Sequence, residues 1–276
     1  MAPPADAGTL TVALDAMGGD RAPAMVVNGA RLACERQPDA RFILFGDRAR
    51  IEPLVARHRS LAERAEIRHT DEVVTNDQKP SQALRQGRGS SMRLAIDSVV
   101  AGEAQCIVSA GNTGALMAMA KFALRMLPGI DRPAIASFFP TLRGESVMLD
   151  LGANIDCRTI HLVQFAFMGA IFARVVLGLP MPTIGLLNVG AESLKGRDEL
   201  KEAAQSLRSL DTLPGRFHGF VEGNDIPAGT VDVVVTDGFT GNVALKTAEG
   251  TASLYSEWLR RTFKSSLSAS IGYFFA

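Results

Sequence analysis

One local pattern recurs along this chain: a short aliphatic run ends in Gly, Asp, Asn, Ser or Thr, and a helix-like stretch follows. Five such turns lie at residues 14–20, 108–114, 149–154, 187–190 and 236–242. If each run is a strand of a parallel sheet, every turn lies at the carboxyl end of a strand, where open α/β sheets bind their ligands. The pattern therefore predicts an α/β fold with a polar pocket at the sheet edge.

Nine segments have the composition of strands, and apolar residues at helical spacing separate most of them. The strands are expected at 10–15, 41–46, 66–69, 105–109, 134–139, 146–151, 183–188, 216–221 and 231–236. The helices between them include 83–100, 116–126, 162–177 and 200–210. This alternation predicts βαβ units and a largely parallel sheet. Since no Gly/Ser linker divides the chain, we expect one composite body over residues 9–250 and a helical segment over 251–276.

Composition excludes several classes of protein. Lys plus Arg equals Asp plus Glu at 29 each, so overall charge gives no reason to expect a nucleic-acid partner. Three cysteines (Cys34, Cys106 and Cys157) without CxxC spacing fit buried residues of a reducing cytosol rather than a disulfide or zinc framework. The start lacks a secretory signal, and the apolar stretch 165–179 is too short to cross a bilayer. We therefore expect a cytoplasmic protein with no metal and no cofactor.

The glycine-rich turns are candidates for anion binding. The chain has no GxGxxG, GxxxxGK[ST], HExxH or GxSxG motif. Backbone N–H groups of a glycine turn, together with the start of the following helix, can bind phosphate without a metal. The candidate phosphate ligands are Ser109, Gly111, Asn112, Thr113, Gly114 and Gly238. For any single turn, the alternative is that the polar residues only cap a helix.

Two further residues are candidates for catalysis. Lys195 lies between Gly190 and Gly196, just after the strand expected at 183–188, and this position lets a lysine reach a phosphate. Its alternative is a surface ion pair with Glu192 at i, i+3. His161 follows a strand-end turn and is a candidate general acid or base, with a purely structural histidine as the alternative.

Two basic stretches suggest surfaces for partners. Residues 79–93 include Arg85, Arg88 and Arg93, which form either a solvated face or a landing surface for an acidic carrier protein. Near the carboxyl end, apolar residues recur at helical intervals beside basic ones, which is typical of a helix in a membrane interface. The expected membrane residues are Trp258, Leu259, Phe263 and Ile271. The alternative is packing against the body or a twin subunit.

Eight segments, in order, resemble the PlsX-type phosphate acyltransferases of bacterial phospholipid synthesis. They are 14–23 (LDAMGGDRAP), 79–85 (KPSQALR), 109–115 (SAGNTGA), 150–156 (DLGANID), 161–169 (HLVQFAFMG), 187–190 with 195–196, 221–225 (VEGND) and 231–250 (VDVVVTDGFTGNVALKTAEG). Thr240 departs from the family, which often has an aliphatic residue there. The family also continues beyond this chain's last residue, Ala276, so we expect a truncated carboxyl end.

The resemblance implies a three-layer α/β/α fold like that of isocitrate and isopropylmalate dehydrogenases and phosphotransacetylases, in a homodimer. It also implies transfer of a long-chain fatty acyl group from acyl carrier protein to inorganic phosphate, at the membrane surface. A phosphotransacetylase-like enzyme using acyl coenzyme A, a decarboxylating dehydrogenase of the same fold and a non-catalytic membrane scaffold are the alternatives.

This reaction suits the residues found, because phosphate is itself the nucleophile and no Ser or Cys nucleophile is needed. The protein must hold phosphate and stabilise an oxyanion. We assign Asn112, Thr113 and Lys195 to phosphate, and Asn242 or Asn154 to the oxyanion. The orienting residues are Asp15, Gly18, Gly19, Asp20, Asp150, Asn188 and Asp237.

Overall fold

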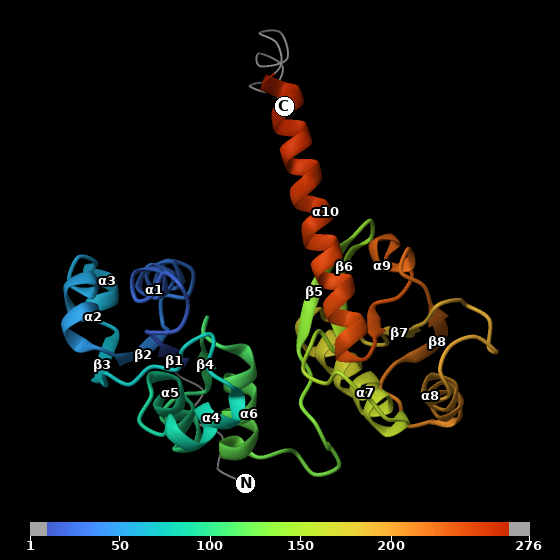
Figure 1. Ribbon diagram of the computed structural model, residues 1–276, viewed down its shortest axis with the longest axis horizontal. Helices are drawn as coiled ribbons and strands as arrows, with labels where there is room; N and C mark the ends of the chain where they lie inside the picture. The colour runs from blue at the N-terminus through green and yellow to red at the C-terminus, as the bar shows by residue number, and fades with distance from the viewer. Residues whose placement is uncertain (1–9, 265–276) are drawn as a thin grey trace. The chain divides into compact units, whose positions relative to one another are not determined.

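The computed structural model describes residues 10–264, which form two compact units with a boundary between Pro128 and Gly129 (Figure 1). Each unit has its own sheet and its own buried core. The five strand-end turns are accordingly divided between two sheets. The expectation of one composite body over residues 9–250 stays a prediction.

The first unit contains a four-stranded parallel sheet in the order β3-β2-β1-β4. Its strands are β1 (Thr11–Asp15), β2 (Arg41–Gly46), β3 (Ala65–His69) and β4 (Cys106–Val108). Its helices are α1 (Ala24–Arg36), α2 (Arg48–Val55), α3 (Arg59–Ala62), α4 (Pro80–Gln86), α5 (Ser91–Val100) and α6 (Thr113–Leu124). One sheet face packs on α1, α2 and α3, and the other packs on α5.

The single helix expected over 83–100 is wrong, because two helices occupy that range. Ser90 lies between them with extended backbone, and its hydroxyl accepts a hydrogen bond from the Arg93 N–H at 3.3 Å. A serine in this position caps the start of a new helix. The break places Arg85 on α4 and Arg93 on α5.

The second unit contains a five-stranded sheet in the order β5-β6-β9-β7-β8. Its strands are β5 (Ala136–Thr141), β6 (Gly144–Leu149), β7 (Thr183–Leu187), β8 (Arg216–Val221) and β9 (Val233–Val235). Its helices are α7 (Thr159–Val176), α8 (Asp198–Ser209), α9 (Asp225–Ala228) and α10 (Gly238–Lys264). All neighbouring strands are parallel except the β5–β6 hairpin, which is antiparallel.

The core of the second unit lies on both faces of its sheet. Val233 and Val235 pack with α7 and α8 on one face, whereas Val234 packs toward α9 and the start of α10 on the other. A strand buried on both faces needs a continuous apolar run, which the sequence provides here. The expected three-layer α/β/α fold is confirmed, with a largely parallel mixed sheet in the second unit and a wholly parallel sheet in the first.

Helix α10 is one continuous helix of 27 residues that starts at the sheet and extends away from it (Figure 1). The boundary expected between residues 250 and 251 therefore falls inside a helix. Ile271 and the other residues beyond 264 lie outside the described residues.

Helix α7 is the one helix within residues 10–264 that has the length and composition to cross a membrane. Half of it is buried inside the second unit, as in the core helix of a soluble protein, so this is weak evidence for a membrane span.

Candidate functional site

Asp150 organises the turn that follows β6 at the carboxyl edge of the second sheet. Its carboxylate is fully buried and accepts four hydrogen bonds. Oδ1 accepts from the backbone N–H groups of Ile135 at 2.9 Å and Ala153 at 3.0 Å. Oδ2 accepts from the backbone and the side-chain amide of Asn154, at 2.7 and 2.9 Å. Asp150 therefore holds the turn after β6 in place, and its orienting role in the reaction stays a prediction.

Asp237 follows β9 and caps the start of α10. Its Oδ1 accepts from the Thr240 backbone N–H at 2.8 Å, and its Oδ2 accepts from the Thr240 hydroxyl at 2.9 Å. The Arg197 guanidinium also donates to Oδ2. This ion pair connects the loop after β7 to the start of α10, so Asp237 holds other groups in place.

Two glycines let α10 approach the Asp150 turn closely. The Gly238 N–H donates to the Asn154 carbonyl at 2.7 Å. A Cβ atom on Gly238 would lie 2.7 Å from that carbonyl oxygen, and one on Gly241 would lie 1.9 Å from the Asp150 carbonyl oxygen. The Gly238 N–H, expected to bind phosphate, is therefore used in packing the helix on the turn.

The two candidate oxyanion donors differ in access. The side-chain amide of Asn154 is 8% exposed and donates to the Pro133 carbonyl at 2.8 Å as well as to Asp150. Asn242 is exposed on the first turns of α10, beside Gly152, whose added Cβ would lie 3.7 Å from the Asn242 Cβ. The geometry thus favours Asn242 as the donor that a substrate can reach.

The loop after β7 folds over Asn188. The Asn188 amide donates to the carbonyls of Gly190 and Lys195 at 3.2 and 3.0 Å. Gly196 has a φ of +88° and lies so close that a Cβ there would be 2.1 Å from the Asn188 Oδ1. That buried oxygen has no hydrogen-bond partner among the described residues. Asn188 therefore sets the path of the loop that carries Lys195.

Lys195 is exposed and forms the i, i+3 ion pair with Glu192 that was the alternative to phosphate binding, at 2.8 Å. The hydrogen bond to Glu192 raises the pKa of Lys195 above its usual value, and the same bond lowers the pKa of Glu192. The lysine is therefore cationic near neutral pH, as a phosphate ligand must be.

His161 and Cys157 are buried close to the turn after β6 that Asp150 organises. The His161 Nδ1 accepts from the Arg158 N–H at 3.2 Å at the start of α7, which favours the structural alternative over acid–base catalysis. Burial raises the pKa of the Cys157 thiol to about 11, and the carboxylates of Asp150 and Asp237 add to the shift. A thiol of this pKa is protonated near neutral pH and is not a nucleophile.

In the first unit, Asp15 gathers the residues that follow β1 and β4. The buried Asp15 carboxylate accepts hydrogen bonds from the hydroxyls of Ser91 at 2.6 Å and Ser109 at 2.7 Å. The Ser109 hydroxyl in turn accepts from the Gly111 N–H at 3.1 Å. A Cβ on Gly18 would lie 2.5 Å from Asp15 Oδ2. These residues meet at one edge of the first sheet, as expected.

The remaining residues of this edge have local roles. Asn112 caps α6 through its Oδ1, which accepts from the Ala115 N–H at 3.0 Å, while its amide donates to the Gln78 carbonyl at 2.8 Å. Both polar ends of this side chain are therefore used, which fits the helix-cap alternative. Thr113 is exposed, and an added Cβ on Gly114 would lie 2.8 Å from Pro80. Asp20 accepts from the Asn76 amide at 2.9 Å, next to Gly19 with a φ of +98°.

Comparison with known proteins decides the family. A family model described as "Fatty acid synthesis protein" matches residues 10–275. The phosphate acyltransferase of Rhodospirillum centenum is 65% identical over 265 residues, which are 96% of this chain and 74% of that protein. The phosphate acyltransferase of Paramagnetospirillum magneticum is 63% identical over 267 residues, 97% of this chain and 76% of that protein.

The chain belongs to the phosphate acyltransferase family.

The expected enzyme class, a phosphate acyltransferase of fatty acid and phospholipid synthesis, is thereby confirmed, with phosphate and an acyl donor as substrates. Solved structures of lower identity share the fold. A phosphotransacetylase from Streptococcus pyogenes has a TM-score of 0.65 and 18% identity, covering 89% of this chain and 82% of that chain. The EutD phosphotransacetylase from Staphylococcus aureus has a TM-score of 0.62 and 16% identity, covering 89% and 83%.

Sequence reasoning missed three polar contacts of this phosphate acyltransferase. Arg197 pairs with Asp237, 40 positions away, Ser91 donates to Asp15, 76 positions away, and Thr240 donates to Asp237. The first two pairs are brought together only by the sheet order, so no spacing in the sequence marks them. The Thr240 contact had a local signal, because an Asp just before a helix commonly accepts from the N–H of the third helical residue.

Proposed function

We propose that the enzyme transfers a long-chain fatty acyl group from acyl carrier protein to inorganic phosphate at the carboxyl edge of the second sheet. The observation that carries this proposal is the exposed Asn242 amide at the start of α10, held beside a turn that the buried Asp150 fixes. A donor held in place before the reaction stabilises developing charge more effectively than mobile water does.

Acyl transfer from a thioester to phosphate needs little general acid or base catalysis by side chains. An oxygen of phosphate attacks the thioester carbonyl carbon, a C–O bond forms, and the carbonyl oxygen becomes an oxyanion. When the C–S bond breaks, the electron pair leaves with the sulfur as a thiolate. Because a thiol has a pKa of about 8.5, this leaving group departs without a strong acid. Placement of phosphate and stabilisation of the oxyanion are the main requirements.

The residues of the second unit divide these tasks. Asn242 donates to the oxyanion, and Lys195 binds phosphate after leaving Glu192. The exposed ion pair between Lys195 and Glu192 competes only weakly with phosphate for the lysine, because solvent screens it. Arg197 fixes the loop that carries Lys195 through its pair with Asp237.

The test compares two asparagines. Asn242→Ala should lower kcat by about 100-fold, as loss of an oxyanion donor does, with little change in Tm. Asn154→Ala is the matched control, and it should lower Tm because it removes hydrogen bonds to Asp150 and Pro133. A normal kcat for Asn242→Ala would remove this residue from the reaction. Assays with labelled phosphate and either acyl carrier protein or coenzyme A thioesters identify the donor.

We further propose that the enzyme is cytoplasmic, associates peripherally with the membrane through α10, and forms a homodimer. Leu254, Tyr255, Trp258 and Leu259 are exposed on this helix, and Arg260 and Arg261 follow them. An apolar face beside basic residues suits an anionic bilayer surface. The double variant Trp258→Ser/Leu259→Ser should float less with anionic liposomes than the wild type. If sedimentation shows instead that the variant loses its dimer, the same face is a subunit contact.

A further inference from the structure

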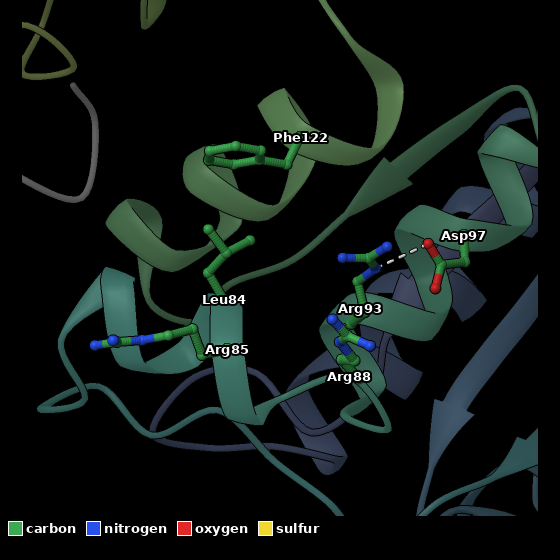
Figure 2. A pocket seen from close by; sticks show the side chains of 6 residues that line it. All are labelled: Leu84, Arg85, Arg88, Arg93, Asp97 and Phe122. Carbon is green, nitrogen blue, oxygen red and sulfur yellow. Dashed lines mark hydrogen bonds and ion pairs between the residues drawn. The ribbon is translucent and has the colours of Figure 1, made fainter.

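A pocket of about 450 Å³ lies among α4, α5 and α6 of the first unit, and its lining is basic (Figure 2). The residues that line it are Leu84, Arg85, Arg88, Arg93, Asp97 and Phe122. None of them belongs to the site described above. The three arginines come from the basic stretch for which the sequence left two alternatives, a solvated face or a landing surface.

The positive charge of this pocket is mostly uncompensated. Arg93 pairs with Asp97 at 2.8 Å. Arg85 donates to the Ser81 carbonyl at 3.1 Å and has no carboxylate partner among residues 10–264, and Arg88 forms no hydrogen bond or ion pair with any described residue. A chain with equal numbers of acidic and basic residues thus gathers three cations and one anion here. Such a surface attracts carboxylates or phosphates.

The shape of the pocket favours a protein surface over a small anion. Figure 2 shows Arg85 pointing away from Arg93, so a single phosphate does not reach all three guanidinium groups. Phe122 is 69% exposed, and Leu84 lies beneath it (Figure 2). Interfaces between proteins combine an apolar centre with a charged rim in this way.

We propose that this pocket is the docking surface for the acidic face of the acyl carrier protein. This inference rests on the proposed function, in which acyl carrier protein is the donor. Arg85 and Arg88 bind carboxylates of the carrier, and Phe122 contacts an apolar side chain between them. The pocket determines how tightly the carrier binds and takes no part in the chemical step.

The experiment reverses the two uncompensated charges in the full-length enzyme. Arg85→Glu/Arg88→Glu should raise KM for the acyl carrier substrate at least tenfold, while kcat and KM for phosphate stay within twofold of the wild type. The effect should shrink as salt is added, since salt screens attraction between exposed charges. Arg36→Glu/Arg57→Glu makes the same change in net charge at two exposed residues outside the pocket; it is the control and should leave every constant unchanged. With an acyl-pantetheine thioester as donor, both variants should match the wild type.

Each other outcome overturns the inference. An unchanged KM for the acyl carrier substrate would show that the pocket does not bind the carrier. If the charge-reversed variant loses as much activity with acyl-pantetheine as with the carrier, the substitutions affect the chemical step or folding. A raised KM for phosphate makes the pocket a phosphate site, and an altered sedimentation coefficient makes it a contact between subunits. If charge reversal prevents folding, Arg85→Gln/Arg88→Gln undergoes the same assays. A wild type that rejects the acyl carrier substrate refutes the proposed function itself, which separates the two failures.

Discussion

Asn154 donates its backbone N–H and its side-chain amide to the same oxygen of Asp150, at 2.7 and 2.9 Å. Because the other oxygen of Asp150 accepts two more backbone N–H groups, one buried carboxylate holds both the turn after β6 and the strand end near Ile135. The Asn154 carbonyl in turn accepts from the Gly238 N–H. The position of α10 therefore depends on the side chain of Asp150.

Replacing Asp150 by Asn should destabilise the enzyme. An amide nitrogen would face at least one N–H donor, and hydrogen bonds to a buried charged group contribute about 1.5–3 kcal/mol each, so we expect a loss of about 3 kcal/mol or more. For a unit of this size, that loss lowers Tm by roughly 6–12 °C. Thermal denaturation followed by circular dichroism measures it. A variant with the Tm of the wild type would show that this network does not hold the turn.

Replacing Lys195 by Ala should raise KM for phosphate at least tenfold, because it removes the cation that the loop after β7 presents. Glu192→Gln is the matched variant. It removes the competing carboxylate, so KM for phosphate should stay the same or fall. Initial rates at varied phosphate concentration measure both. If phosphate dependence is the same in all three proteins, Lys195 has no part in phosphate binding.

Two glycines of α10 should respond to alanine in opposite ways. Gly241→Ala places a methyl group 1.9 Å from the Asp150 carbonyl oxygen, so the helix must shift, at a cost of about 3 kcal/mol. An added Cβ on Gly250 meets nothing within 4 Å, so Gly250→Ala should stabilise the helix by about 1 kcal/mol. Urea unfolding gives both values. Equal effects would contradict the close approach of α10 to the turn.

Cys157 should resist alkylation at a pH where Cys106 reacts. Burial raises the pKa of the Cys157 thiol from 9.0 to about 11. Partial burial also raises the pKa of the Cys106 thiol, but Cys106 is exposed and a reagent can reach it. Because the folded-state pKa is raised, the thiol contributes stability that is complete below about pH 9 and is lost as pH rises through 11. Iodoacetamide labelling at pH 8, followed by mass spectrometry, compares the two cysteines. Urea should remove the difference, and equal labelling of the folded protein would place Cys157 in contact with solvent.

The fold was predictable because its signal is local. All nine expected strands are present, and the valine run at 233–235 marks a strand buried on both faces. The helix break at Gly87–Ser90 was missed, since apolar spacing continues across it and only the Ser90 cap reveals it. The division at Pro128–Gly129 lies in a short loop with Pro and Gly but without a long Gly/Ser linker, so the sequence marked a turn there and not a boundary between units.

The site was predictable by residue type more than by role. Asp15, Asp150 and Asp237 were expected to orient other groups, and each accepts several hydrogen bonds. Asn112 and Gly238 were assigned to phosphate, yet their hydrogen bonds cap α6 and pack α10. A polar residue at a helix start can serve the helix or a ligand, and only the positions of its neighbours distinguish the two.

The continuity of α10 fixes a length. At a rise of 1.5 Å per residue, the 20 steps from Gly238 to Trp258 span about 30 Å. The start of the helix is anchored at the candidate site by Asp237, and the far part carries the exposed Trp258. The helix therefore fixes the distance between the candidate site and any surface that Trp258 contacts. Inserting four residues into α10 would increase that distance by about 6 Å.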